Sequence, residues 1–298
     1  QMAPGEIENL VESDAVAFRV RFEGEAPPPE QMYWRGPVLG FFTGRRWDAG
    51  TRPASARTPM ADLGNPTYRY ELTLEPQRRP WLLALDLPSR DGLPNDATLT
   101  SDYQLVANGE VKERRLYTLV SHTRYQLQTE LPEELRRTFL QLPKYGNPRT
   151  QALAQQWRAD GKDDQQIIAA ALDMFRGKDF YYTLHPPVLG RDGVDEFLFI
   201  THRGFCEHYA SAFAVLMRAA GIPARIVTGY QGGAPNAFGD YYVVKQSDAH
   251  AWTEVWLDGR GWVRVDPTAA VSPQRVEKGL NDALQGTGEL PAYMDPAR

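Results

Sequence analysis

Residues 203–225 read RGFCEHYASAFAVLMRAAGIPAR, and the architecture of the C-terminal half can be worked out from this stretch. Its apolar residues recur at intervals of three and four, the spacing of one face of an α-helix. The residues on this stripe are Tyr209, Phe213, Leu216, Met217 and Ala220. Gly221 is a typical helix terminator, and Pro223 prevents continuation. The stretch therefore predicts a helix that begins near Cys206 and ends at Gly221.

Cys206 is the single cysteine of the chain and stands at the start of this predicted helix. A lone cysteine is more often a small buried hydrophobic residue than a functional one. The position favours function, because a helix start carries unpaired N–H groups and partial positive charge, which stabilise a thiolate. The same N–H groups can hold an oxyanion when a thiolate attacks a carbonyl. We therefore expect Cys206 to be a nucleophile with a lowered pKa.

A thiolate nucleophile needs a histidine base and a third group that orients it. His208 is a poor base for Cys206, because side chains two residues apart on a helix point in different directions. His250 starts one predicted strand and Asp266 ends the next. If the hairpin loop between the two strands has an odd number of residues, His250 and Asp266 lie on the same face of the sheet. They are directly opposite each other if the numbers of paired residues add up to 516. An even number of loop residues would place them on opposite faces. Cys206, His250 and Asp266 are the candidate catalytic residues, although His250 and Asp266 taken singly are as typical of structural roles.

The remaining C-terminal pattern alternates between helical and strand periodicity. Two helices are expected before Cys206, over 148–159 and 163–176. Strands are expected after it, over 225–230, 241–246, 249–257 and 262–266. Residues 273–298 are polar and aperiodic, so a tail or linker is expected there.

The first 130 residues alternate apolar and polar side chains with the period of β-strands. The expected strands are 16–22, 68–74, 98–106, 113–120 and 124–128, separated by turn signals such as Asp91-Gly92. This pattern predicts a sandwich-like β domain over 10–130, followed by a connector over 131–149. Four aromatic residues there are expected to pack in a core rather than to line a binding surface: Trp34, Phe41, Phe42 and Trp47.

Composition excludes several classes of protein. The 298 residues carry a net charge of −5, so no basic excess exists to bind nucleic acid. No apolar run approaches the ~20 residues that span a bilayer, and no signal peptide is visible. A chain that starts at Gln1 is consistent with an excised or mature fragment. A single cysteine excludes an internal disulfide, and Cys206, His202 and His208 make a ligand-poor metal site. We therefore expect no metal and no cofactor.

Four motifs follow one another in the C-terminal half: RGFCEHYA at 203–210, RAAGIPAR at 218–225, HAW at 250–252 and GWVRVDPT at 261–268. With these motifs in this order, the chain resembles the transglutaminase-like superfamily over residues 150–272. The resemblance implies an α+β, papain-like core in which a cysteine-bearing helix packs on an antiparallel sheet, here preceded by an all-β domain. It implies that Cys206 is the nucleophile, that His250 is the general base and acid, and that Asp266 orients His250.

The N-terminal region also carries segments like those of bacterial, membrane-anchored members of this superfamily, namely YWRG at 33–36 and FTGRRW at 42–47. This resemblance implies a periplasmic, extracytoplasmic domain of an inner-membrane protein whose membrane segments are absent here. We expect the N-terminal region to recognise or position a partner and to supply no catalytic group.

The implied activity is acyl transfer from a glutamine-type amide, through a thioester on Cys206, to an amine. Two alternatives remain: an amidase or peptidase using the same triad on peptides or peptidoglycan stems, and a non-catalytic binding module. Animal transglutaminases use a tryptophan before the cysteine as an oxyanion donor, and Trp157, on a predicted helix, cannot be mapped onto that role. Tyr182 and Trp252 are the candidates for oxyanion or substrate contacts.

Overall fold

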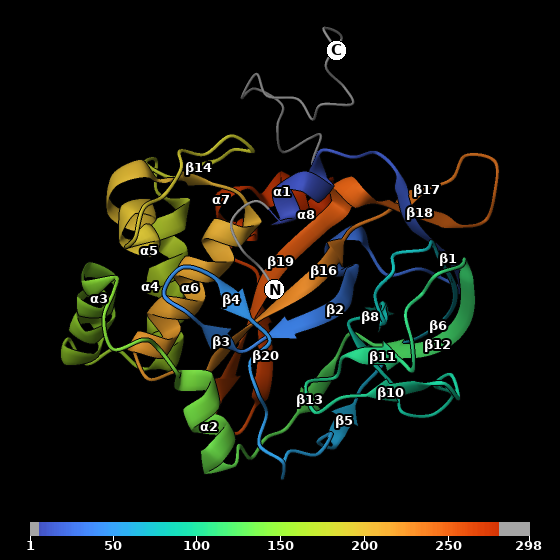
Figure 1. The fold of residues 1–298 in the computed structure, drawn as a ribbon, viewed down its shortest axis with the longest axis horizontal. Coiled ribbons are helices and arrows are strands. Elements are labelled where there is room, and N and C mark those ends of the chain that lie inside the picture. The colour runs from blue at the N-terminus through green and yellow to red at the C-terminus, as the bar shows by residue number, and fades with distance from the viewer. Residues whose placement is uncertain (1–5, 280–298) are drawn as a thin grey trace, which may run out of the picture.

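The structure is a computed structural model, which describes residues 6–279. Figure 1 shows three layers: a group of helices, a central seven-stranded sheet and a second sheet on the side away from the helices. One hydrophobic core lies between the helices and the central sheet, and another lies between the two sheets. No helix in the described range is long and apolar enough to cross a bilayer. The expected α+β class is confirmed.

The central helix of the helical layer is α6 (Cys206–Ala219), which begins and ends as the sequence predicts. It packs on β19 (Ala249–Leu257) and β16 (Ala224–Gln231) of the central sheet. Asp163 caps α4 in a capping box with Gln166, which fixes the start of that helix. The other helices are α1 (Glu6–Val11), α2 (Glu133–Leu140), α3 (Pro148–Ala159), α4 (Asp164–Arg176), α5 (Gly193–Glu196), the π-turn η2 (Phe197–Thr201), α7 (Thr268–Val271), α8 (Pro273–Glu277) and the short 3-10 turns η1 (Pro29–Gln31) and η3 (Gln246–Asp248).

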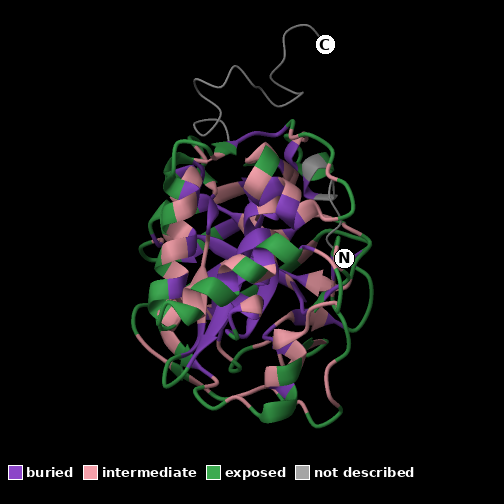
Figure 2. Ribbon diagram, turned by 90° about the vertical axis from the view of Figure 1, so that its left-hand side faces the viewer, coloured by how far each residue is buried: buried purple, intermediate pink, exposed green. Residues whose placement is uncertain are grey.

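The central sheet has the order β5-β13-β20-β19-β16-β2-β8. Its pairs are antiparallel except β13 with β20. Its remaining strands are β2 (Tyr33–Leu39), β5 (Ala61–Leu63), β8 (Ala84–Leu85), β13 (Tyr125–Leu127) and β20 (Gly261–Val265). In the perpendicular view of Figure 2, the buried residues concentrate in the strands that lie behind the helices.

The second sheet has the order β17-β18-β1-β6-β12-β9. Its strands are β1 (Val16–Glu23), β6 (Thr67–Leu74), β9 (Leu87–Pro88), β12 (Arg115–His122), β17 (Ala234–Pro235) and β18 (Tyr242–Lys245). Smaller sheets contain β3 (Phe41–Phe42) with β4 (Trp47–Asp48), β14 (Tyr181–Tyr182) with β15 (Arg203–Gly204), and β7 (Trp81–Leu82), β10 (Ala97–Leu99) and β11 (Leu105–Ala107). The strand expected over 98–106 is therefore two short strands joined by a turn.

Strands of the N-terminal region and strands of the C-terminal region pair with each other in both large sheets. The strands expected to form a separate β domain over 10–130 therefore belong to sheets that the C-terminal region completes. β2 pairs with β16, and β18 pairs with β1. The connector expected over 131–149 contains α2, and the tail expected from residue 273 begins with α8; residues 280–298 lie outside the described range. Hydrophobic period tells which side of a strand is buried, but not which distant strand lies beside it.

The pair β2–β16 brings the two halves into close backbone contact. A Cβ built on Gly229 would lie 1.9 Å from the carbonyl oxygen of Trp34, so only glycine fits this position. Trp34, Phe42 and Trp47 are buried as expected, whereas Phe41 is 43% exposed. Trp34 thus packs in the core between the two sheets, whereas Phe42 and Trp47 pack in the core between the helices and the central sheet.

Candidate active site

Cys206 lies at the first position of α6, and its neighbours explain why the helix starts there. The N–H of Phe205 donates a hydrogen bond to Nδ1 of His208 at 3.3 Å, which caps the helix. Burial lowers the pKa of His208 to about 4, so the ring is a neutral acceptor at neutral pH. A Cβ on Gly204 would lie 2.5 Å from the Cβ of His208, so glycine is needed beside the cap. His208 is thus part of the helix start, consistent with its exclusion as a base.

The thiol of Cys206 is closed off from solvent, with 1% of the residue exposed. Burial, followed by the negative charge of Glu207, raises the pKa of Cys206 to about 12. Arg275 and a hydrogen bond from the N–H of Ala251 act in the opposite direction. The lowered pKa expected from the helix start alone is therefore wrong for the closed site, because desolvation outweighs the helix end. The resting group is a neutral thiol.

His250 and Asp266 meet as expected, but by a different register. Nε2 of His250 lies 2.8 Å from Oδ2 of Asp266. The hairpin loop, residues 258–260, has an odd number of residues, so His250 and Asp266 share a face as expected. The register pairs Thr253 with Val265, however, so the numbers of paired residues add up to 518 and not to 516. Asp266 therefore lies just beyond the end of β20, diagonal to His250, and reaches back to it.

The electrostatics of this pair assign a protonation state to each partner. Burial alone would raise the pKa of Asp266, but its interaction with His250 and three hydrogen bonds hold it below the usual range, so it is a carboxylate. Burial lowers the pKa of His250, against the opposing effect of Asp266, so the ring is neutral at neutral pH. A carboxylate only accepts hydrogen bonds, so Nε2 of His250 carries the proton. Nδ1 is then a basic lone pair, and it is buried without a hydrogen-bond partner among the described residues.

Asp266 has a further partner that the sequence did not predict. The hydroxyl of Tyr33, on β2, donates to Oδ2 of Asp266 at 2.7 Å, and the N–H of Thr268 donates to Oδ1 at 3.0 Å. The Tyr33 ring also lies under the guanidinium of Arg264, 4.0 Å from its carbon to the ring centroid. The N-terminal region therefore supplies a positioning contact to the candidate site through Tyr33, a role separate from the expectation that it supplies no catalytic group. Tyr33 is in the quoted YWRG segment, but nothing local in that segment shows what the hydroxyl contacts.

Tyr182 and Trp252 lie on different sides of the site. Tyr182 is buried on β14, where it pairs with Gly204 of β15, two residues before Cys206. Trp252 stacks beside His250, with ring centroids 6.3 Å apart, and meets Tyr33 edge to face at 5.0 Å. Tyr182 therefore lies near the cysteine, whereas Trp252 supports the imidazole from the sheet face that α6 does not cover.

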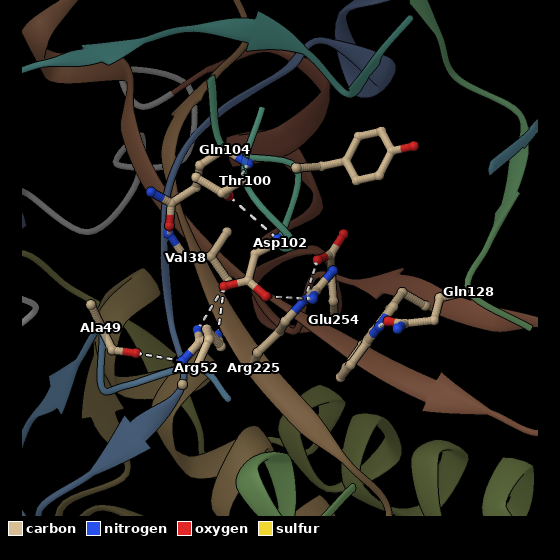
Figure 3. Close-up of polar contacts among 12 residues, drawn as sticks. Val38, Ala49, Arg52, Thr100, Asp102, Gln104, Gln128, Arg225 and Glu254 are labelled. Carbon is tan, nitrogen blue, oxygen red and sulfur yellow. Dashed lines mark hydrogen bonds and ion pairs between the residues drawn. The ribbon is translucent and has the colours of Figure 1, made fainter. Parts of the chain in front are cut away.

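Further along β19, Glu254 and Trp256 contact residues of the N-terminal region. Glu254 joins a group of charges that we call the Glu254 cluster, comprising Arg35, Arg52, Asp102, Arg225 and Glu254, of which all but Arg52 are buried. Figure 3 shows the contacts of Arg52, Asp102, Arg225 and Glu254. Glu254 accepts from Arg35 at 2.8 Å and from Arg225 at 2.9 Å. Trp256 donates to the carbonyl of Gln128 at 2.7 Å. Glu254 and Trp256 therefore bond to residues outside α6.

Metal binding has no visible support in the range 6–279, where no group of three or more His, Cys, Asp and Glu side chains is arranged to hold an ion. The chemistry available at the site is that of the Cys206 thiol and of the hydrogen-bonded pair His250 and Asp266.

Sequence comparison finds two family matches. The profile of the TgpA N-terminal domain matches residues 1–128, and that of the transglutaminase-like superfamily matches residues 151–267. A protein-glutamine gamma-glutamyltransferase of Pseudomonas aeruginosa is 45% identical over 288 residues, which are 97% of this chain and 43% of that protein. The uncharacterized protein YebA of Bacillus subtilis is 37% identical over 137 residues, 44% of this chain and 19% of that protein. The chain thus spans less than half the length of these curated relatives.

Structure comparison agrees. The periplasmic domain of TgpA from Pseudomonas aeruginosa superposes with a TM-score of 0.90 at 45% identity, covering 95% of this chain and 98% of that one. The same domain bound to ethylmercury gives a TM-score of 0.88, covering 93% of this chain and 98% of that one. The chain therefore corresponds to a periplasmic domain almost from end to end.

Proposed function

The chain belongs to the transglutaminase-like superfamily, and from this we propose that it transfers an acyl group from a glutamine-type side-chain amide to an amine, with Cys206, His250 and Asp266 as its catalytic residues. The observation that carries the proposal is the orientation of His250. Asp266 accepts the hydrogen bond of Nε2, so the buried Nδ1 of His250 is left to act as a base. Ala251, the next residue along the strand, donates its N–H to the Cys206 sulfur. A silent binding module would not need this arrangement.

The first half of the reaction forms a thioester and releases ammonia. Nδ1 of His250 takes the thiol proton, and the sulfur attacks the amide carbon to give a tetrahedral oxyanion. Unpaired N–H groups at the start of α6, the helix that Cys206 begins, stabilise that oxyanion in this proposal. The C–N bond then breaks, and the Nδ1 proton passes to the leaving nitrogen. Asp266 stabilises the imidazolium while it exists.

The second half regenerates the thiol. An amine attacks the thioester carbon, Nδ1 removes the amine proton, and the C–S bond breaks. The sulfur takes the proton back from His250, so the products are a substituted amide and the starting enzyme. Water in place of the amine would give an acid instead, which is the amidase or peptidase outcome.

Incorporation of a fluorescent primary amine into casein tests the proposal. We expect incorporation by the unmodified chain and none by Cys206→Ala. Ammonia release without incorporation would instead indicate a hydrolase, and neither signal would indicate a binding module. The pair His250→Gln and His208→Gln provides a matched control. The first should abolish turnover, whereas the second should lower stability and leave most of the turnover.

Binding of a mercury compound provides a second test of Cys206. The related periplasmic domain of TgpA is described as bound to ethylmercury, and soft metals bind thiolates. Because Cys206 is the only cysteine here, we expect one equivalent of ethylmercury to bind and to block incorporation. Binding that persists in Cys206→Ala would contradict this.

The natural acyl donor is proposed to be a protein or peptide, and the parent chain is proposed to be anchored in the inner membrane.

A further inference from the structure

Arg275 is a fully buried cation at the edge of the site. It lies on α8, outside the residues that match the superfamily, and none of its surface is exposed. Its Nη1 donates to the side chain of Gln231 at 3.1 Å, and its Nη2 donates to the carbonyls of Asp248 and Ala249 at 3.2 and 3.3 Å. The last two carbonyls directly precede His250. Arg275 therefore holds the start of β19.

The charge of Arg275 has no ion-pair partner within the described part of the chain, where its hydrogen-bond partners are neutral oxygens and its Nε is unpartnered. The buried arginines of the Glu254 cluster, by contrast, share carboxylates. The negative groups nearest to Arg275 act on it without a direct ion pair, and Asp248 and Asp266 are among them. In a closed site, a buried positive charge stabilises further negative charge that develops close to it.

Comparison with a second buried arginine, Arg218, shows how the surroundings of Arg275 affect its pKa. Both are buried arginines that donate to carbonyl oxygens, Arg218 to Ala224, Gln141 and Gly40. Burial lowers the pKa of Arg218 to about 9. Burial acts in the same direction on Arg275, yet its pKa is raised, because Tyr182, Asp248, Cys206 and Asp266 all favour its charge. The groups around Arg275 are thus mainly those of the active site.

We propose that Arg275 is a positioning residue whose buried positive charge stabilises the negative charge that Cys206 acquires when it is deprotonated. This rests on the proposed function of Cys206. The charge acts on the sulfur alongside the Ala251 N–H and opposes the effects of burial and of Glu207. The α8 segment thereby becomes part of the catalytic apparatus.

The rate of alkylation of Cys206 by iodoacetamide at a fixed neutral pH tests this proposal, because the single cysteine makes the signal unambiguous. Arg275→Gln should slow alkylation at least about tenfold, the change in thiolate fraction for a pKa rise of one unit. A purely structural role predicts the opposite sign, since loosening the closed site exposes the thiol more often. Arg275→Lys, which keeps the charge, should restore most of the rate. In the amine assay, kcat should fall for Arg275→Gln while KM is unchanged.

Arg218→Gln is the matched control: it removes an equally buried arginine at the far end of α6, and alkylation should stay the same or become faster. Folding of each variant is checked by thermal unfolding. Unchanged or faster alkylation in folded Arg275→Gln would overturn the proposal, as would a folded Arg275→Lys that reacts slowly. If Arg275→Gln does not fold, the lysine variant decides alone. Failure of the unmodified chain to react at Cys206 would instead contradict the proposed function.

Discussion

Tyr33 and His250 donate hydrogen bonds to the same oxygen of Asp266, from 2.7 and 2.8 Å, although the chain separates Tyr33 from Asp266 by 233 residues. The carboxylate is thus fixed by one residue from the N-terminal region and orients one from the C-terminal region. Burial and the Asp266 charge raise the pKa of Tyr33, so the phenol is protonated and remains a donor at neutral pH. The N-terminal region therefore contributes to the geometry of the site.

Tyr33→Phe tests this contribution. The variant removes one hydrogen bond to a charged acceptor, worth about 1.5–3 kcal/mol. We expect turnover to fall by about tenfold or more, because Asp266 is then less firmly placed against His250. Steady-state kinetics of amine incorporation provide the measurement. Tyr117→Phe is the control, since it removes a buried hydroxyl that donates to the Leu83 carbonyl at 2.8 Å, far from the catalytic residues. Equal turnover in both variants would show that Tyr33 is only structural.

Asp266→Asn should leave the fold intact and greatly reduce turnover. An amide in this position can donate to Nε2 of His250, which would place the ring proton on Nδ1 and remove the base. It also cannot balance the imidazolium charge, and losses in comparable triads reach ~10⁴ in kcat. The control is Asp102→Asn in the Glu254 cluster, which should lower stability with little effect on turnover. Near-normal turnover in Asp266→Asn would require another third residue.

Glu254 makes stability depend on acidity. Although burial opposes it, pairing with Arg35 and Arg225 lowers the pKa of Glu254 from 4.5 to about 2. Its contribution is fully present above pH 4.5 and is lost as the pH falls towards 2. At neutral pH, Glu254→Gln should cost about 3–5 kcal/mol, because it leaves buried cations without a counter-ion.

Urea unfolding at several pH values measures this effect. The difference between the unmodified chain and Glu254→Gln should be largest near pH 7 and should shrink as the pH is lowered below 4.5. Glu71→Gln, which removes an exposed partner of Arg21, is the control and should cost under about 1 kcal/mol. A gap that stays constant with pH would mean that ionisation of Glu254 does not stabilise the fold.

A fragment that begins near residue 131 should not fold by itself. A catalytic region that formed its own domain would retain reactivity at Cys206. The sheets predict otherwise, because removing residues 1–130 takes β2, β5, β8 and β13 from the central sheet and leaves β18 without β1. Circular dichroism melts of the fragment, alone and mixed with residues 1–130, test this. A cooperative melt of the isolated fragment would show that the C-terminal region is autonomous.

The sequence was informative where structure is local. The apolar stripe on α6 and the shared face of His250 and Asp266 could be predicted, because helical period and strand alternation depend on near neighbours. The exact register of the hairpin could not be predicted, because strand alternation does not distinguish two registers that differ by two residues. Tyr33 and Arg275 were missed, because each reaches the site through long-range packing and carries no local signal of its target. The thiol pKa was misjudged because sequence shows the helix start but not how completely the site is closed.

The pairing of β1 with β18 and of β2 with β16 also constrains the order in which the molecule can be made. A chain emerging from its N-terminus exposes one open edge of β1 until β18 has been synthesised, and one open edge of β2 until β16 has been. Unpaired strand edges of partly made chains are sites of aggregation. The N-terminal segment therefore carries two unpaired strand edges while the rest of the polypeptide is produced. Premature termination before residue 224 would release a product with both edges uncovered.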